Sequence, residues 1–164
     1  MDDITISKDY KSISLSTAAE EVRQKFQYVL DSDSSVRDIY DHTVKTVVSA
    51  PAAGYNTTVL VVGSSNTSKR QTFEGLVPLA LEGLASTLSQ MGKQAVGSGG
   101  QFKYMCGCSY VEIVEEVVQD LLKSDNINLD IVEHPVRGIE VQGVTYAGPL
   151  TDVRDLKTVF VKGS

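Results

Sequence analysis

Residues 54–75 read GYNTTVLVVGSSNTSKRQTFEG, and this stretch decides the fold of the chain. Residues 58–62 are apolar or β-favouring and end abruptly at Gly63, after which small polar residues lead into a helix-competent segment. A run with so few charges predicts a strand buried on both faces, then a turn and a helix start. That is the layout of a phosphate-binding loop. We therefore expect an α/β fold with residues 58–62 and 104–113 as central strands, covered by helices that start near Ser35 and Ser68.

The loop departs from the phosphate-binding template G-x-x-x-x-G-K-[ST] at two of its four defining positions. Gly63 and Lys69 match, but Ser68 replaces the second glycine and Arg70 replaces the hydroxyl that holds magnesium. A non-glycine residue forced to positive φ at the second position would cost about 1–2 kcal/mol. We therefore predict a vestigial loop, with no catalytic residue, no bound cofactor and no metal.

The residues around the loop resemble those of kinesin motor heads. GYNTT before the strand and TFEG after the loop are similar to the G-Y-N-x-T and T-[MF]-E-G of that family. Further matches follow in family order: FQY at 26–28, IY at 39–40, SYVEI at 109–113, QDLL at 119–122 and VQGVT at 141–145. The resemblance therefore covers nearly the whole chain.

The resemblance implies a P-loop NTPase-like, kinesin-like mixed sheet flanked by helices, in truncated form. The family's first strand, with its R-x-R-P residues, would precede Met1. Its two switch motifs, N-x-x-S-S-R-S-H and D-L-A-G, would follow Ser164. We expect residues 1–164 to form a single kinesin-like domain that lacks the first strand and the switch I/II half.

Elsewhere, the pattern of apolar residues predicts the order of short elements. Residues 4–6 and 13–15 read as a hairpin, and residues 26–30 continue the β character. Ser35 is the expected N-cap of a helix that Pro51 and Gly54 terminate. The remaining predictions are a helix from the loop to about residue 91, a strand over 102–114, a β segment or a helical turn over 117–122, short strands at 129–132 and 138–141, and a final helix capped at residues 151–152.

Composition narrows the class of partner. The 164 residues, 41% of them hydrophobic, are enough for one core, and the net charge of −6 argues against nucleic-acid binding. No apolar run is long enough to span a bilayer, and the acidic start argues against secretion. We expect no nucleic-acid or membrane partner, and a location in the cytoplasm and cytoskeleton, with a cilium, flagellum or basal body as a specific site.

The other reactive side chains are interpreted as structural, because none has a partner at a catalytic or metal-ligating spacing. They are Cys106, Cys108, His42, His134, Glu112, Glu115 and Glu116.

ATP hydrolysis needs a bound magnesium ion, a positioned water and a γ-phosphate sensor. The loop has lost its magnesium hydroxyl at Arg70, and the other two functions belong to the switch motifs that would follow Ser164. We therefore predict that the chain is not an enzyme but a non-catalytic, kinesin-like structural or protein-interaction domain of a cytoskeletal protein. Its expected partners are a second copy, in a homodimer, and microtubule-associated proteins. Two alternatives stay open: a nucleotide-binding fragment of a kinesin-type ATPase completed by another segment or chain, and a microtubule-binding lobe built on residues 124–145.

Overall fold

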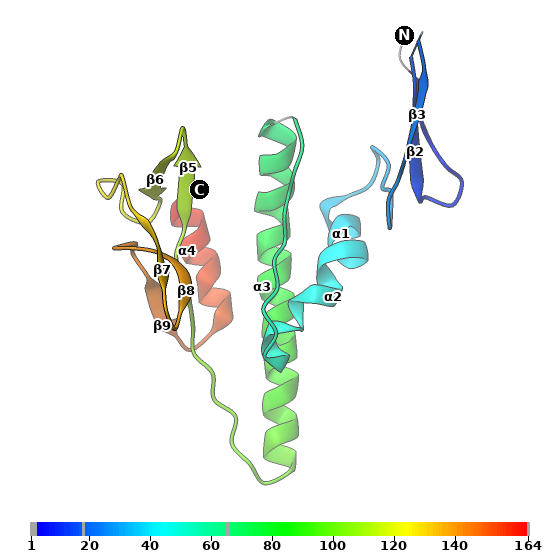
Figure 1. The fold of residues 1–164 in the computed structure, drawn as a ribbon. Helices are drawn as coiled ribbons and strands as arrows, with labels where there is room; N and C mark the ends of the chain where they lie inside the picture. Colours follow the sequence, from blue (N-terminus) through cyan, green and yellow to red (C-terminus); the bar gives the residue numbers. More distant parts are fainter. Residues whose placement is uncertain (1–2, 18, 65, 164) are drawn as a thin grey trace. The chain divides into compact units, whose positions relative to one another are not determined.

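The computed structural model of the chain describes residues 3–17, 19–64 and 66–163 (Figure 1). The chain divides into two compact units. The first unit comprises Met1–Ala80 and the second comprises Leu81–Ser164. The boundary between them falls inside the long helix α3, which runs over Asn66–Gly97 and contains Pro78.

The first unit begins with a three-stranded antiparallel sheet of β1 (Asp3–Ile6), β2 (Ser12–Ser16) and β3 (Glu21–Lys25). The β1–β2 pairing confirms the predicted hairpin. The strand predicted over residues 26–30 is wrong, because the third strand lies just before it. The amides of Phe26 and Val29 instead donate to the carbonyls of Lys11 and Tyr10, at 2.8 and 2.7 Å, which ties this segment to the β1–β2 turn.

A helical segment follows and contains three consecutive parts: α1 (Val36–Ile39), a π-helix (Tyr40–Val44) and α2 (Lys45–Val48). Ser35 is its N-cap, as predicted, and forms a capping box with Asp38. A short 3-10 helix (Pro51–Ala53) then ends at Gly54, whose φ of +89° favours glycine.

Helix α3 packs on this segment in the first unit. Leu76 lies in one buried cluster with Tyr40 and Val44. At Gly75 the approach is so close that an added Cβ would lie 2.8 Å from a methyl group of Val36. The helix is longer than predicted, because it begins at Asn66 and continues to Gly97.

The α/β fold class is confirmed, but the predicted central strand at residues 58–62 is wrong for the described chain. The segment is extended, and it pairs with no strand among the described residues. The exposed fractions are 47% for Val59, 80% for Leu60 and 87% for Val62. An extended segment becomes a strand only when a neighbour shares its backbone hydrogen bonds, and no described segment supplies one.

The second unit carries three antiparallel strand pairs. Strand β4 (Cys106–Cys108) pairs with β9 (Ala147–Leu150), β5 (Val111–Val114) with β6 (Val117–Asp120), and β7 (Ile131–His134) with β8 (Gly138–Val141). The single strand predicted over 102–114, with its central part at 104–113, is therefore wrong: the register shifts between Cys106 and Cys108, and β4 and β5 take different partners. Of the two alternatives for residues 117–122, the β segment is right, and the short strands predicted near 129–132 and 138–141 are confirmed.

A 3-10 turn (Val153–Asp155) follows, with Asp152 as its N-cap, and helix α4 (Leu156–Gly163) comes after it. Val153 is fully buried. Within the described residues, no helix combines the length and the apolar character that crossing a membrane requires.

Asp120 is the buried polar centre of this unit. Its carboxylate accepts hydrogen bonds from the amide of Leu122 at 2.9 Å, the amide of Thr145 at 2.7 Å and the side chain of Asn126 at 3.2 Å. Burial acts to raise the pKa of Asp120, but the hydrogen bonds from Thr145, Leu122 and Asn126 outweigh it and lower that pKa to about 2. One ionised side chain at the end of β6 thus connects the turn at residues 122–126 to the segment at residue 145.

Candidate phosphate-binding loop

Lys69 lies in the first turn of α3. A Cβ added at Gly63 would lie 3.6 Å from Cγ and 3.8 Å from Cδ of Lys69, so the aliphatic stem of the lysine crosses the glycine. The first turn of a helix also carries a partial positive charge from its aligned peptide dipoles. The loop therefore keeps a cation and a helix N-terminus, the two features that attract a phosphate.

Ser68 does not bear the backbone strain that the sequence suggested. It lies within α3, in helical conformation, and the non-glycine residues with positive φ in the described chain are Tyr10, Glu115, Glu116 and Asn128. The expectation of strain at Ser68 is wrong, because helix α3 starts two residues earlier than predicted.

Arg70 contacts Glu74 one helical turn further along. Its Nε lies 2.6 Å from Oε1 of Glu74, in an i,i+4 ion pair whose arginine side chain is 69% exposed. A guanidinium offers only N–H donors, whereas Mg²⁺ is bound by oxygen ligands. This loop position does not fit a magnesium ion. In addition, no cluster of His, Cys, Asp and Glu suited to a metal occurs in the residues that the structure describes.

The two cysteines lie on β4. Burial raises the pKa of both thiols, and for Cys106 the nearby carboxylates of Asp152 and Asp155 raise it further. The Cys106 thiol also lies 3.6 Å from the carbonyl of Leu150 on the paired strand. Thiols with raised pKa values are poor nucleophiles, which agrees with a structural role.

The two histidines also contact backbone or ring neighbours. His42 stacks on Tyr28, with ring centroids 4.4 Å apart, and its Nδ1 lies 2.8 Å from the carbonyl of Asp38. Nδ1 of His134 accepts hydrogen bonds from the amides of Val136 and Arg137, at 3.1 and 3.2 Å. The histidine at 134 therefore stabilises the turn between β7 and β8.

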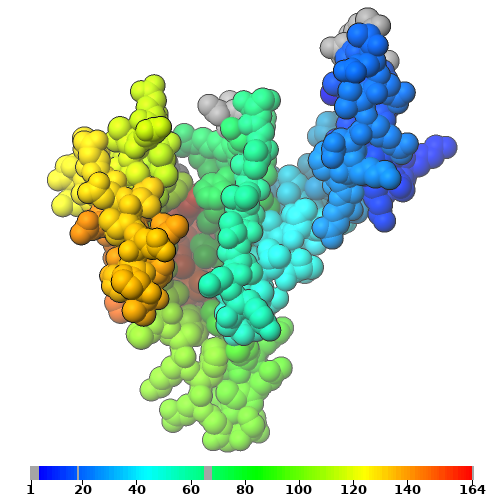
Figure 2. Space-filling view, viewed as in Figure 1, coloured from blue at the N-terminus to red at the C-terminus, as the bar shows by residue number. Residues whose placement is uncertain are grey.

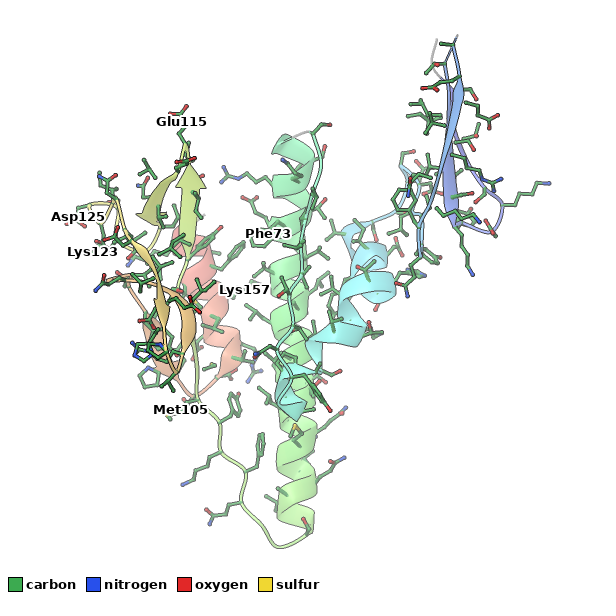
Figure 3. The ribbon with its side chains drawn as sticks, viewed as in Figure 1. Phe73, Met105, Glu115, Lys123, Asp125 and Lys157 are labelled. Carbon is green, nitrogen blue, oxygen red and sulfur yellow. The ribbon has the colours of Figure 1, made fainter. Side chains whose placement is uncertain are left out.

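The glutamates lie on or beside the β5–β6 hairpin. Glu115, labelled in Figure 3, and Glu116 form its two-residue turn, whereas Glu112 lies on β5. The hairpin tip projects from the surface of the second unit (Figure 2). Sequence reasoning missed both this turn and the Asp120 network, because Val-Glu-Glu-Val contains no turn-forming glycine, asparagine or proline.

Comparisons with known proteins show which family the chain resembles in sequence and in fold. The kinesin motor domain model matches residues 2–164. The chain is 27% identical over 154 residues to kinesin-related protein 3 of Dictyostelium discoideum. The matched region covers 87% of the chain and 12% of that protein. It is 26% identical over 165 residues to the kinesin heavy chain of Syncephalastrum racemosum, covering 92% of the chain and 17% of the relative.

A solved structure described as that of a fast kinesin, with implications for ATPase mechanism and interactions with microtubules, shares the fold. The TM-score is 0.80 at 22% sequence identity, over 99% of this chain and 46% of that one. The chain thus spans less than half of that solved structure and less than a fifth of the two curated relatives above.

The family match overturns one prediction. We expected the chain not to be an enzyme, but the kinesin motor domains that it matches are ATPases, so that prediction is wrong. The prediction relied too heavily on the substitutions at Ser68 and Arg70 and too little on the family motifs that match. One of its premises, backbone strain at Ser68, does not hold.

Proposed function

The chain belongs to the kinesin motor domain family, and on that premise we propose that it is the phosphate-loop part of a microtubule-associated motor ATPase. The observation that carries the proposal is the placement of Lys69 across Gly63 in the first turn of α3. A lysine in the N-terminal turn of a helix, beside a glycine of the preceding loop, is suited to the phosphates of a nucleotide.

The proposed phosphate-binding loop lacks the residue that would bind magnesium. Arg70 supplies no oxygen and is paired with Glu74, so the loop position that usually contacts magnesium contributes no ligand. The motifs N-x-x-S-S-R-S-H and D-L-A-G do not occur in these 164 residues. We propose that the chain itself supplies no catalytic residue and no metal ligand, that it is a single kinesin-like domain without the switch I/II half, and that another segment or chain completes the site.

Nucleotide titration tests this function. This proposal replaces our expectation from the sequence that the loop holds no cofactor. With a fluorescent ATP or ADP analogue we expect saturable binding, and replacing Lys69→Ala should weaken it roughly tenfold or more through loss of a charge-assisted contact. Lys93→Ala is the matched control, because Lys93 is an exposed lysine of the same helix, far from its N-terminus. If the unmodified chain shows no saturable binding, or if both variants lose it equally, the proposal is wrong.

The metal requirement gives a second measurement on the same samples. Because the loop offers no magnesium ligand, we expect equal nucleotide affinity with magnesium and with a chelator. Arg70→Thr restores a hydroxyl and should make binding stronger with magnesium than without it.

Two interactions belong to the same proposal. The first is microtubule contact through residues 124–145, where Ile131, Val136 and Ile139 are 53%, 87% and 78% exposed on and around the β7–β8 hairpin. Co-sedimentation with microtubules tests it. We also propose a cytoplasmic, cytoskeletal location, which suits this contact, with a cilium, flagellum or basal body as the specific site.

The second interaction is self-association. Leu60 and Val62 are almost fully exposed on an extended segment that no described strand covers. Unpaired extended backbone with apolar side chains invites pairing with another chain, and a symmetric homodimer is the commonest closed arrangement. We propose that two copies pair along this segment.

A further inference from the structure

A groove of about 500 Å³ lies in the second unit, between one face of α3 and two later segments of the chain. The α3 residues at its wall, among them Glu82, Ser86, Ser89 and Gly92, recur every three or four positions and so share a face. At Gly92 an added Cβ would lie 3.6 Å from a ring carbon of Phe102, so the aromatic ring lies close against the helix.

Phe102 and Tyr104 form the aromatic wall of the groove. Their ring centroids are 6.1 Å apart and their planes are tilted by 43°, so the two rings present differently oriented π surfaces to the same space. The face of an aromatic ring carries partial negative charge and attracts an ammonium or guanidinium group within about 6 Å of its centre.

The charged groups of the groove favour the same kind of ligand. Two carboxylates, Glu82 and Asp152, line it against a single guanidinium, Arg154. That guanidinium is already engaged, because its Nε lies 3.0 Å from both carboxylate oxygens of Asp152. Glu82 has no ion-pair partner among the residues that the structure describes. One negative charge is thus left over, and an anionic ligand would meet no free cation there.

We propose that this groove binds a lysine or arginine side chain presented by a basic peptide segment of a partner protein. The cationic group lies against the rings of Phe102 and Tyr104 and pairs with the carboxylate of Glu82. Ser86 and Ser89 are exposed at the groove wall, where their hydroxyls can hydrogen-bond the peptide backbone. The volume is within the range of about 300–1,000 Å³ typical of ligand sites.

This site is independent of the phosphate-binding loop. The lining residues described here lie between positions 82 and 154, in the second unit, whereas Gly63 and Lys69 belong to the first. Lys69→Ala should therefore leave peptide binding unchanged, and failure of nucleotide binding would carry no consequence for the groove.

A peptide titration of the ¹⁵N-labelled 164-residue chain, followed by NMR, tests the proposal. The probe is acetyl-Gly-Lys-Gly-amide, and its matched control carries norleucine, which keeps the aliphatic stem and lacks the charge. We expect saturable shifts at amides near residues 82–92 and 102–104 with the lysine peptide, and roughly tenfold or weaker binding of the norleucine peptide.

Two variants locate the contact. Glu82→Gln should weaken the lysine peptide several-fold, whereas Glu112→Gln removes an exposed carboxylate of the same unit and should have no effect. Phe102→Leu keeps an apolar wall without the π face and should also weaken binding. The proposal is overturned if neither peptide binds, if both bind equally, or if Glu82→Gln has no effect. Butylammonium binding as tightly as the lysine peptide would overturn the peptide as the ligand.

Discussion

Asp120 links the charge of a single carboxylate to the stability of the second unit. It is fully buried, and its pKa of about 2 lies below the value of about 3.9 typical of an unfolded chain. A group with a lowered folded-state pKa stabilises the fold above its unfolded value, and that contribution is lost as the pH falls. We expect about 1–2 kcal/mol of the free energy of unfolding to be lost between about pH 4 and pH 2, as measured by urea denaturation.

The variant that tests this is Asp120→Asn. Its NH₂ group would face the donors of Asn126 or Thr145, so we expect a loss of about 2 kcal/mol or more at pH 7 and a weaker dependence of stability on pH. Asp125→Asn is the control, because Asp125 is an exposed aspartate of the same turn (Figure 3). Equal pH slopes for Asp120→Asn and the unmodified chain would contradict the assignment.

At the scale of elements, the β5–β6 hairpin carries strain in its turn. Glu115 and Glu116 have φ values of +48° and +67°, a pair of left-handed residues that type I′ turns require and that asparagine and glycine adopt most easily. Replacing Glu115→Asn together with Glu116→Gly should stabilise the chain by about 1 kcal/mol and raise its Tm by roughly 2–4 °C.

Calorimetry measures this change, and a double glutamine variant controls for charge. Glu115→Gln with Glu116→Gln removes the same two negative charges without relieving the backbone, so its Tm should stay close to that of the unmodified chain. An equal rise in both double variants would mean that charge repulsion, and not backbone conformation, destabilises the turn.

At the scale of the whole molecule, the proposed pairing along the exposed segment has a measurable mass. Light scattering should report about twice 17.7 kDa at micromolar concentration. Val62→Lys places a charge on the segment and should give a monomer, whereas Val136→Lys, at a side chain equally 87% exposed in the other unit, should leave the dimer intact. A monomer at every concentration would exclude this assembly.

The sequence predicted the parts of the molecule that depend on neighbouring residues. The Ser35 cap, the first hairpin and the β7–β8 pair follow from local pattern, and the family follows from motifs at fixed spacing. What it could not predict depends on distant contacts. Residues 58–62 have the composition of a buried strand, yet burial requires neighbours that the described chain does not provide. In the sequence, Asp120 does not differ from the other acidic residues, because the amide of Thr145 that donates to it is distant along the chain.

The close approach of Gly75 to Val36 restricts the order in which these two positions could change by mutation. With Val36 in place, an alanine at 75 would put its methyl group 2.8 Å from a valine carbon, so that intermediate is damaged. If Val36→Ala comes first, it removes the obstructing methyl groups from a half-buried site, and Gly75→Ala then has room. The same double mutant is therefore reached through a tolerated single mutant when Val36 changes first, and through a destabilised one when Gly75 changes first. Which substitutions are open at one position thus depends on what has already happened at the other.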